Sequence, residues 1–209
     1  KVKNAFKKMD YEEALESNLE SLEWIAEHDG QFGHFIGGRF TKPKNLFKTI
    51  NPFNKKEIAQ ISQGTVADIK KSVQAARSGL EKWQSVGPLQ RSKYLYAIAR
   101  YIQKESRTIS VLESMENGKS IRESRDIDIP LAARHFYYHA GWAQLLDEEF
   151  QDYSAIGVCG QIIPWNFPIL MLAWKVAPAI AAGNSVILKP AEQTSLTALY
   201  FAEICKRIK

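Results

Sequence analysis

Apolar residues recur at steps of three and four along four stretches of the chain, the spacing of one face of an α-helix. This pattern predicts helices over residues 11–27, from 66 to Gly87, from Pro88 to Gly118, and over 129–146. The second helix follows Thr65, which with Asp68 resembles a capping box that has Asp in place of the usual Glu or Gln. The third begins at Pro88, because proline is tolerated where the first amides of a helix are free.

The first predicted helix is followed by strands. Its buried stripe is expected to consist of Tyr11, Leu15, Leu19, Leu22 and Ala26. Glycines end the helix, and two short strands follow over residues 34–36 and 46–50, with a turn around Pro43 between them. Asn51-Pro52 closes this segment.

The pattern changes after Asp152, where two short apolar runs alternate with two helical segments. The runs cover residues 156–163 and 185–188, and the helices cover 169–182 and about 195 to the end. This order, with uniformly apolar strands, is typical of a parallel sheet covered on both faces. The sequence therefore predicts an α/β fold, with a helical and hairpin region over residues 1–150 and the start of a second domain over 151–209.

The composition is that of an ordinary globular protein, since 45% of the 209 residues are apolar and 24% are charged. It excludes a disordered chain, a collagen and a disulfide-stabilised miniprotein. The formal net charge is +5, but basic and acidic residues alternate in blocks along the chain. A nucleic-acid module would more typically gather one basic face with interleaved aromatics. We therefore expect no nucleic-acid partner.

The cysteines and the longest apolar stretch indicate a location. Cys159 and Cys205 form no Cys-x-x-Cys pair, which fits free thiols in a reducing compartment. The first thirty residues contain no apolar run of signal-peptide length. The longest apolar stretch, residues 167–183, is interrupted by Lys175 and two prolines. We expect a cytoplasmic protein with no membrane partner.

Candidate chemistry lies after the two apolar runs, because ligands of parallel α/β sheets bind at the carboxyl ends of the strands. The loop after the first run contains Asn166 in a turn between two prolines. Its side-chain amide could donate a hydrogen bond to a developing oxyanion. The alternative is that Asn166 only caps the following helix, a role in which Asn is frequent.

The loop after the second run contains Lys189 and Glu192, three positions apart. A carboxylate after the second strand of a dinucleotide-binding fold often binds the adenosine ribose. The alternative is a solvated Lys and Glu near the start of a helix.

Three further patterns point to no chemistry. The fingerprint G-x-G-x-x-G is absent, because Gly157 and Gly160 have the wrong spacing and lie within a strand, so any cofactor must be held differently. His135 and His139 share a helical face without a third ligand, which favours an aromatic-packed pair over a metal site. Cys159 stands in a strand that is expected to be buried, where a thiol behaves as a small hydrophobe.

Three motifs that follow one another resemble the aldehyde dehydrogenase superfamily. They are Gly-Gln-Ile-Ile-Pro-Trp-Asn-Phe-Pro over residues 160–168, Ala173-Trp174-Lys175 with Pro-Ala-Ile-Ala-Ala-Gly-Asn over 178–184, and Leu-Lys-Pro-Ala-Glu-Gln-Thr over 188–194. Upstream, Gly118-Lys119 and residues 138–143 are also similar to the amino-terminal half of that family. The opening segment, with Trp24-Ile25-Ala26 before Gly33-His34-Phe35, resembles the two-module sixteenth branch more than the common tetrameric enzymes.

The resemblance implies a helical and β-hairpin front segment that leads into the first strands of a Rossmann-type parallel sheet, an incomplete domain. It implies that Asn166 holds the oxygen of an aldehyde substrate during thiohemiacetal formation. The residues that would hold the cofactor are Ile162, Ile163, Pro164, Trp165, Lys189, Pro190, Ala191 and Glu192. Lys189 and Glu192 would bind the adenosine ribose, and Lys175 is a second candidate near the reaction centre.

The carboxylate at Glu192 also bears on cofactor choice. The extra phosphate of NADP would meet this anion in a partly desolvated site. We therefore expect the cofactor to be NAD rather than NADP.

The resemblance also has a departure, because family members carry the catalytic cysteine and the general-base glutamate in the half that follows. Neither Cys159 nor Cys205 stands in the nucleophile's motif, and the covalent route requires a nucleophile. We expect the front portion of a longer NAD-dependent enzyme, inactive alone and homo-oligomeric when full length. Residues 146–154 offer only a short segment for the family's assembly hairpin. The alternative is a non-catalytic dinucleotide-binding or assembly module on the same fold.

Overall fold

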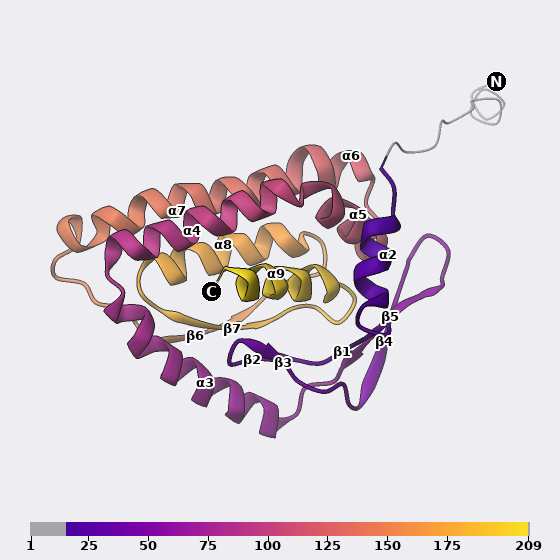
Figure 1. Cartoon of the computed structure of the whole chain (residues 1–209), viewed down its shortest axis with the longest axis horizontal. Helices are drawn as coiled ribbons and strands as arrows, with labels where there is room; N and C mark the ends of the chain where they lie inside the picture. Colours follow the sequence, from indigo (N-terminus) through magenta and orange to yellow (C-terminus); the bar gives the residue numbers. More distant parts are fainter. Residues whose placement is uncertain (1–15, 209) are drawn as a thin grey trace.

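The computed structural model describes residues 16–208, which form a group of long helices beside small sheets (Figure 1). The front helices are α2 (Leu19–Ala26), α3 (Val66–Ser85), α4 (Pro88–Lys104), α5 (Ser106–Asn117), α6 (Ile121–Glu123), the π-helix η1 (Ser124–Asp128) and α7 (Ile129–Glu149). The front strands are β1 (Gln31–Phe32), β2 (Phe35–Ile36), β3 (Arg39–Phe40), β4 (Leu46–Ile50) and β5 (Glu57–Ser62). The remaining elements are β6 (Val158–Ile162), α8 (Pro168–Ala181), β7 (Ser185–Lys189) and α9 (Leu196–Arg207).

Helix α2 is shorter than predicted and buries another face. Residues 11–15 of the predicted helix lie outside the described residues, and residues 16–18 are not helical. Leu19 and Leu22, which belong to the predicted stripe, are exposed, whereas Trp24 and Ile25 are buried. The ring of Trp24 packs against those of Phe32 and Tyr200, and contact with the distant Tyr200 favours burial of this face.

The front strands form two sheets. The predicted strand at residues 34–36 corresponds to β2, which pairs antiparallel with β3 through a glycine turn. Gly37 and Gly38 have φ angles of 62° and 80°, which a two-residue hairpin turn requires. Strand β4 has the predicted bounds, but its antiparallel partner β5 was not predicted. Ala59 and Ile61 of β5 are buried, although Glu57 and Gln60 weaken its apolar pattern.

The capping box at the start of α3 is confirmed. The Thr65 hydroxyl accepts the amide proton of Asp68 at 3.3 Å, and the Asp68 carboxylate accepts that of Thr65 at 3.1 Å. Hydrogen bonds from Thr65 and Lys44 hold the pKa of Asp68 far below its usual range. The amides of Thr65 and Asp68 therefore both have partners.

Replacing Thr65 with alanine should lower the free energy of unfolding by about 1 kcal/mol, because the helix loses a side-chain cap. Denaturant unfolding of the variant and the parent protein measures this change. Ser85→Ala, at the exposed carboxyl end of the same helix, should change the free energy by less than about 0.5 kcal/mol. Equal losses in both variants would contradict a role for the cap.

The helix predicted from Pro88 to Gly118 is interrupted, which corrects that prediction. Glu105 adopts φ −103° and ψ 19° and separates α4 from α5. Gly118 ends α5 with a φ of 85°, and a Cβ there would lie 2.5 Å from the ring of Pro52. The two short elements α6 and η1 were not predicted.

Strands β6 and β7 are parallel, as predicted, and pair from Val158–Ser185 to Ile162–Lys189. Within the described residues each strand pairs only with the other, and the pair contacts α3 and α8 (Figure 1). Every residue of both strands is half-buried or exposed, so the prediction of full cover on both faces was wrong for this part of the sheet. Cys159 is accordingly half-buried.

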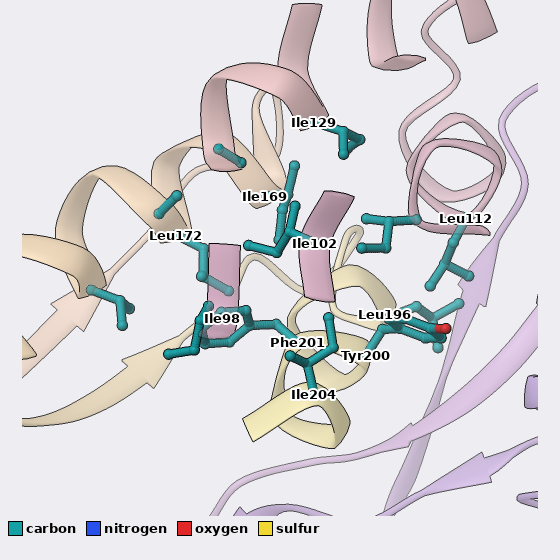
Figure 2. Close-up of a cluster of buried hydrophobic side chains, with 14 of the residues drawn as sticks. Ile98, Ile102, Leu112, Ile129, Ile169, Leu172, Leu196, Tyr200, Phe201 and Ile204 are labelled. Atoms are coloured by element: carbon teal, nitrogen blue, oxygen red, sulfur yellow. The ribbon is translucent and has the colours of Figure 1, made fainter. Parts of the chain in front are cut away.

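The main core lies where the central helices meet. Figure 2 shows Ile98 and Ile102 of α4 close to Leu172 of α8 and to Phe201 and Ile204 of α9. The same core includes residues from both sides of position 150, where the domain boundary stays a prediction. Every helix within residues 16–208 is too short or too polar to span a bilayer.

Candidate functional site

The two candidate loops leave the same edge of the β6–β7 pair. Ile162 and Lys189 end their strands as register partners, and the amide of Ile163 donates to the carbonyl oxygen of Lys189 at 3.1 Å. The parallel direction places both carboxyl ends at this edge, where ligands of α/β sheets bind. The structure therefore brings the predicted groups of residues together.

Asn166 is exposed in the bend between β6 and α8. Its side-chain amide makes no hydrogen bond to any residue in the described range. The N-cap position of α8 is occupied by Phe167, without a side-chain cap. Asn166 thus does not cap the helix, and its amide is available to an incoming ligand.

The other residues of the first loop differ in exposure. Ile162, Pro164 and Trp165 are exposed, while Ile163 is only 2% exposed and belongs to the core. An adjacent ligand can therefore meet the side chains of the first three. Ile163 does not meet such a ligand, because the whole residue is buried and its amide already donates to Lys189.

The second loop contains an ion pair. The Lys189 ammonium lies 2.7 Å from the Glu192 carboxylate and also donates to the carbonyl oxygen of Pro190 at 3.0 Å. The hydrogen bond from Lys189 lowers the pKa of Glu192, so this residue is anionic at neutral pH. Both side chains are exposed, whereas Ala191 is buried. The pair is thus open to a hydroxyl-rich ligand. Its exposure also agrees with the alternative of a solvated Lys and Glu near the start of a helix.

Lys175 reaches the same strand end from α8. Its ammonium donates to the carbonyl oxygen of Ile162 at 2.6 Å, and its own carbonyl oxygen accepts from the side chain of Gln161 at 2.8 Å. The cation therefore borders the loop that contains Asn166.

The histidine pair and Cys205 belong to neither of these two loops. The rings of His135 and His139 stack at 6.3 Å, and His135 also stacks on Trp174 at 5.9 Å, as expected for an aromatic-packed pair. Residues 16–208 contain no group of three or more His, Cys, Asp or Glu side chains that could hold a metal ion. Burial raises the pKa of the Cys205 thiol to about 12.

Sequence reasoning missed two buried glutamates that contact the helices following the two loops. Glu113 and Glu116 of α5 are buried, although α5 was expected to turn an apolar face to the core. Glu116 accepts the amide protons of Leu196 and Thr197 at 2.7 and 2.9 Å and also the Thr197 hydroxyl, so it caps α9. Burial raises the pKa of Glu116 to about 7. The only sequence signal is two glutamates three positions apart beside apolar positions.

Comparison with known proteins finds related sequences. The family model described as aldehyde dehydrogenase family matches residues 40–209. An acetaldehyde dehydrogenase from Pseudomonas aeruginosa is 43% identical over 178 residues, which are 79% of this chain and 35% of that protein. Retinaldehyde dehydrogenase 3 from Rattus norvegicus is 38% identical over 189 residues, 83% of this chain and 37% of that protein.

Solved structures give the same result. The NAD⁺ complex of an aldehyde dehydrogenase from Bacillus cereus superposes with a TM-score of 0.82 at 33% identity, covering 89% of this chain and 41% of that one. An aldehyde dehydrogenase from Pseudomonas syringae, complexed with NAD⁺ and octanal, has a TM-score of 0.79 at 29% identity, covering 87% and 39%.

The chain thus spans somewhat more than a third of the length of these relatives. The family model covers most of the chain, and the fold of the described residues is that of the amino-terminal portion of the solved enzymes. On these grounds the chain belongs to the aldehyde dehydrogenase family.

Proposed function

We propose that this chain supplies the oxyanion-binding amide and the adenosine-ribose site of an NAD-dependent aldehyde dehydrogenase, which oxidises an aldehyde to a carboxylic acid. Asn166 is the amide donor, and Lys189 with Glu192 holds the ribose. The observation that carries the proposal is the pairing of Ile162 with Lys189, which brings both loops to one edge. The Asn166 amide there is free of hydrogen bonds to the described residues.

The Asn166 side chain suits an oxyanion because it is a neutral donor at a fixed place. Attack on an aldehyde carbonyl transfers negative charge to its oxygen, and a preorganised donor stabilises this charge more than it stabilises the ground state. Pro164 and Pro168 restrict the backbone on both sides of the loop. Lys175 supplies a cation beside the preceding strand end.

The residues at the edge fit an adenosine dinucleotide. When bound, NAD provides the reaction with a hydride acceptor. The exposed side chains of Ile162 and Trp165 offer apolar surface beside the Lys189–Glu192 pair. A carboxylate after the second strand is suited to accept a hydrogen bond from the ribose hydroxyl.

The charge of Glu192 supports NAD over NADP. The lowered pKa of this residue keeps its carboxylate ionised, so the additional phosphate of NADP would be repelled. The NAD⁺ complexes among the similar solved structures support the same choice.

We further propose that the thiol nucleophile comes from sequence other than these 209 residues. A thiolate at Cys205 is unfavourable, because burial raises its pKa to about 12. Cys159 lies within β6 and before its carboxyl end. The octanal in the Pseudomonas syringae complex supports an aldehyde as the substrate.

The proposal extends to the assembly and location of the complete protein. We propose a cytoplasmic homo-oligomer, related to the two-module branch, in which a first region ends near residue 150. Residues 150–157 between α7 and β6 contain no strand. This supports a contact between subunits that does not use a hairpin at this place.

Incubation of the complete protein with NAD and octanal tests this function, with NADH formation as the readout. We expect turnover by the complete protein, and no turnover with weak NAD binding by the 209-residue chain, measured by titration calorimetry. NAD binding without aldehyde oxidation by the complete protein would indicate the non-catalytic module instead. Oxidation by the 209-residue chain would refute the placement of the nucleophile elsewhere.

A further inference from the structure

The residues on both sides of Asn166, Trp165 and Phe167, contact the segment at the end of α5. The Asn117 side chain donates a hydrogen bond to the carbonyl oxygen of Trp165 at 2.6 Å. The Lys119 ammonium lies 4.3 Å from the centre of the Phe167 ring, a cation–π distance. Asn166 lies between these two anchored residues and is itself exposed without a described partner.

A third anchor, the buried Glu113, holds Ile169, two positions after Phe167. Glu113 accepts the amide proton of Ile169, in the first turn of α8, at 3.1 Å. No side chain at the N-cap position satisfies this end of α8, so the acceptor comes from α5. Three anchors at alternate positions, 165, 167 and 169, therefore come from one short segment of the chain.

Lys119 connects these anchors to one another. Its ammonium lies 3.5 Å from the Glu113 carboxylate and forms an ion pair with Asp128 of η1. The Lys119 side chain is only 8% exposed, and both carboxylate side chains are fully buried. The position of this ammonium therefore depends on two carboxylates that have no access to water.

The charges of the cluster are balanced when Glu113 is protonated. Burial raises the pKa of Glu113 despite the opposing charge of Lys119, and the nearby Asp128 acts in the same direction as burial. The remaining pair of Lys119 and Asp128 is then neutral. Removal of the lysine would break its ion pair with the buried Asp128, which is strongly unfavourable.

We propose that Lys119, supported by Glu113, Asp128 and Asn117, is a positioning residue that orients the backbone around Asn166 and presents its amide to the substrate oxygen. This inference rests on the proposed function, since Lys119 acts only through Asn166. A donor is effective only if it is held at the position where the oxyanion forms. A displacement of about 1 Å in such a group can cost about 10²-fold in rate.

Lys119→Met in the complete protein tests the proposal, because methionine keeps the stem beside Phe167 and removes the ammonium. We expect kcat for aldehyde oxidation to fall about tenfold to 10²-fold. The dissociation constant of NAD, measured by titration, should change less than about threefold, since Lys119 contacts Phe167, Glu113 and Asp128 and none of the residues proposed to hold the cofactor. Rates are normalised to the folded fraction measured by circular dichroism.

A double-mutant cycle separates positioning from general damage. In the Asn166→Ala background, Lys119→Met should lower kcat by less than about threefold, because the amide that it orients is absent. A purely structural role would lower kcat by the same factor in both backgrounds and would overturn the inference. An unchanged kcat in Lys119→Met alone would also overturn it.

The two proposals fail in different ways. If Asn166→Ala leaves kcat unchanged while chemistry is rate-limiting, the oxyanion role itself is wrong, and the positioning role falls with it. If Asn166→Ala lowers kcat but the two substitutions multiply, only the positioning role is wrong.

Two further variants complete the design. If Lys119→Met does not fold, Asn117→Ala takes its place, because it removes one hydrogen bond and leaves no buried charge. We then expect a smaller decrease in kcat, about threefold to tenfold, which again disappears in the Asn166→Ala background. Lys44→Met is the control for loss of a lysine–aspartate pair, because it breaks the 3.1 Å pair between the more exposed Lys44 and Asp68, far from this loop in the sequence. An equal loss of kcat in this control would overturn the proposal.

Discussion

Asn166→Ala is expected to lower kcat of the complete protein about 10²- to 10³-fold, the usual loss for one oxyanion donor. The amide donates to charge that exists only in the transition state, so the Michaelis constant of the aldehyde should change much less than kcat. Asn166→Asp, of equal size, should be at least as damaging, because a carboxylate would repel the oxyanion. Steady-state kinetics with NAD and octanal provide both constants.

The control for this prediction is Asn54→Ala. Asn54 lies in an exposed turn near β5, where its side chain accepts the amide proton of Lys56 at 2.9 Å. The Asn54→Ala substitution should leave kcat unchanged. If Asn166→Ala also leaves kcat unchanged, with hydride transfer shown to limit the rate, Asn166 is not the oxyanion donor.

Glu192→Gln is expected to shift the ratio of NADP to NAD affinity about tenfold to 10²-fold toward NADP. The amide forms a weaker hydrogen bond with the ribose than the carboxylate does, and hydrogen bonds to charged groups contribute about 1.5–3 kcal/mol. The substitution also removes the negative charge that opposes the extra phosphate. Because 58% of the Glu192 side chain is exposed, solvent screening limits this second effect.

Calorimetric titration of the variant and the parent with both cofactors measures this shift. Glu203→Gln is the control for loss of a glutamate–lysine pair, because Glu203 pairs with Lys206 three positions away on α9 and also with Arg207. Its affinity ratio should remain that of the parent. Tighter NADP binding by the parent protein would contradict the argument from charge.

Regular helices and the order of elements in the last third could be predicted from local patterns. The apolar spacing predicted helices where α4 and α7 lie, and Leu95, Ile98 and Phe136 of these helices are buried. The capping box at Thr65 involves contacts between neighbours in sequence, and for this reason it was visible without the fold. Strands β6 and β7 were found because apolar runs bounded by turns recur on either side of a helix.

The elements that were predicted wrongly or not at all share a different cause. Helix α2 buries Trp24 against Tyr200, and β5 depends on pairing with both β1 and β4, so contacts from elsewhere in the chain outweigh the local pattern. The interruption at Glu105 similarly lets α5 turn away from α4. None of these partners can be read from the residues that surround each element in sequence.

The sequence by itself determined the family, the parallel α/β order and the two loops with Asn166, Lys189 and Glu192, because motifs and apolar periodicity are local properties. Only the tertiary structure decided that Asn166 does not cap α8 and that Glu113 takes this role from 56 positions away. A buried carboxyl group is tolerated where hydrogen-bond donors converge on it, and that convergence exists only in the folded chain.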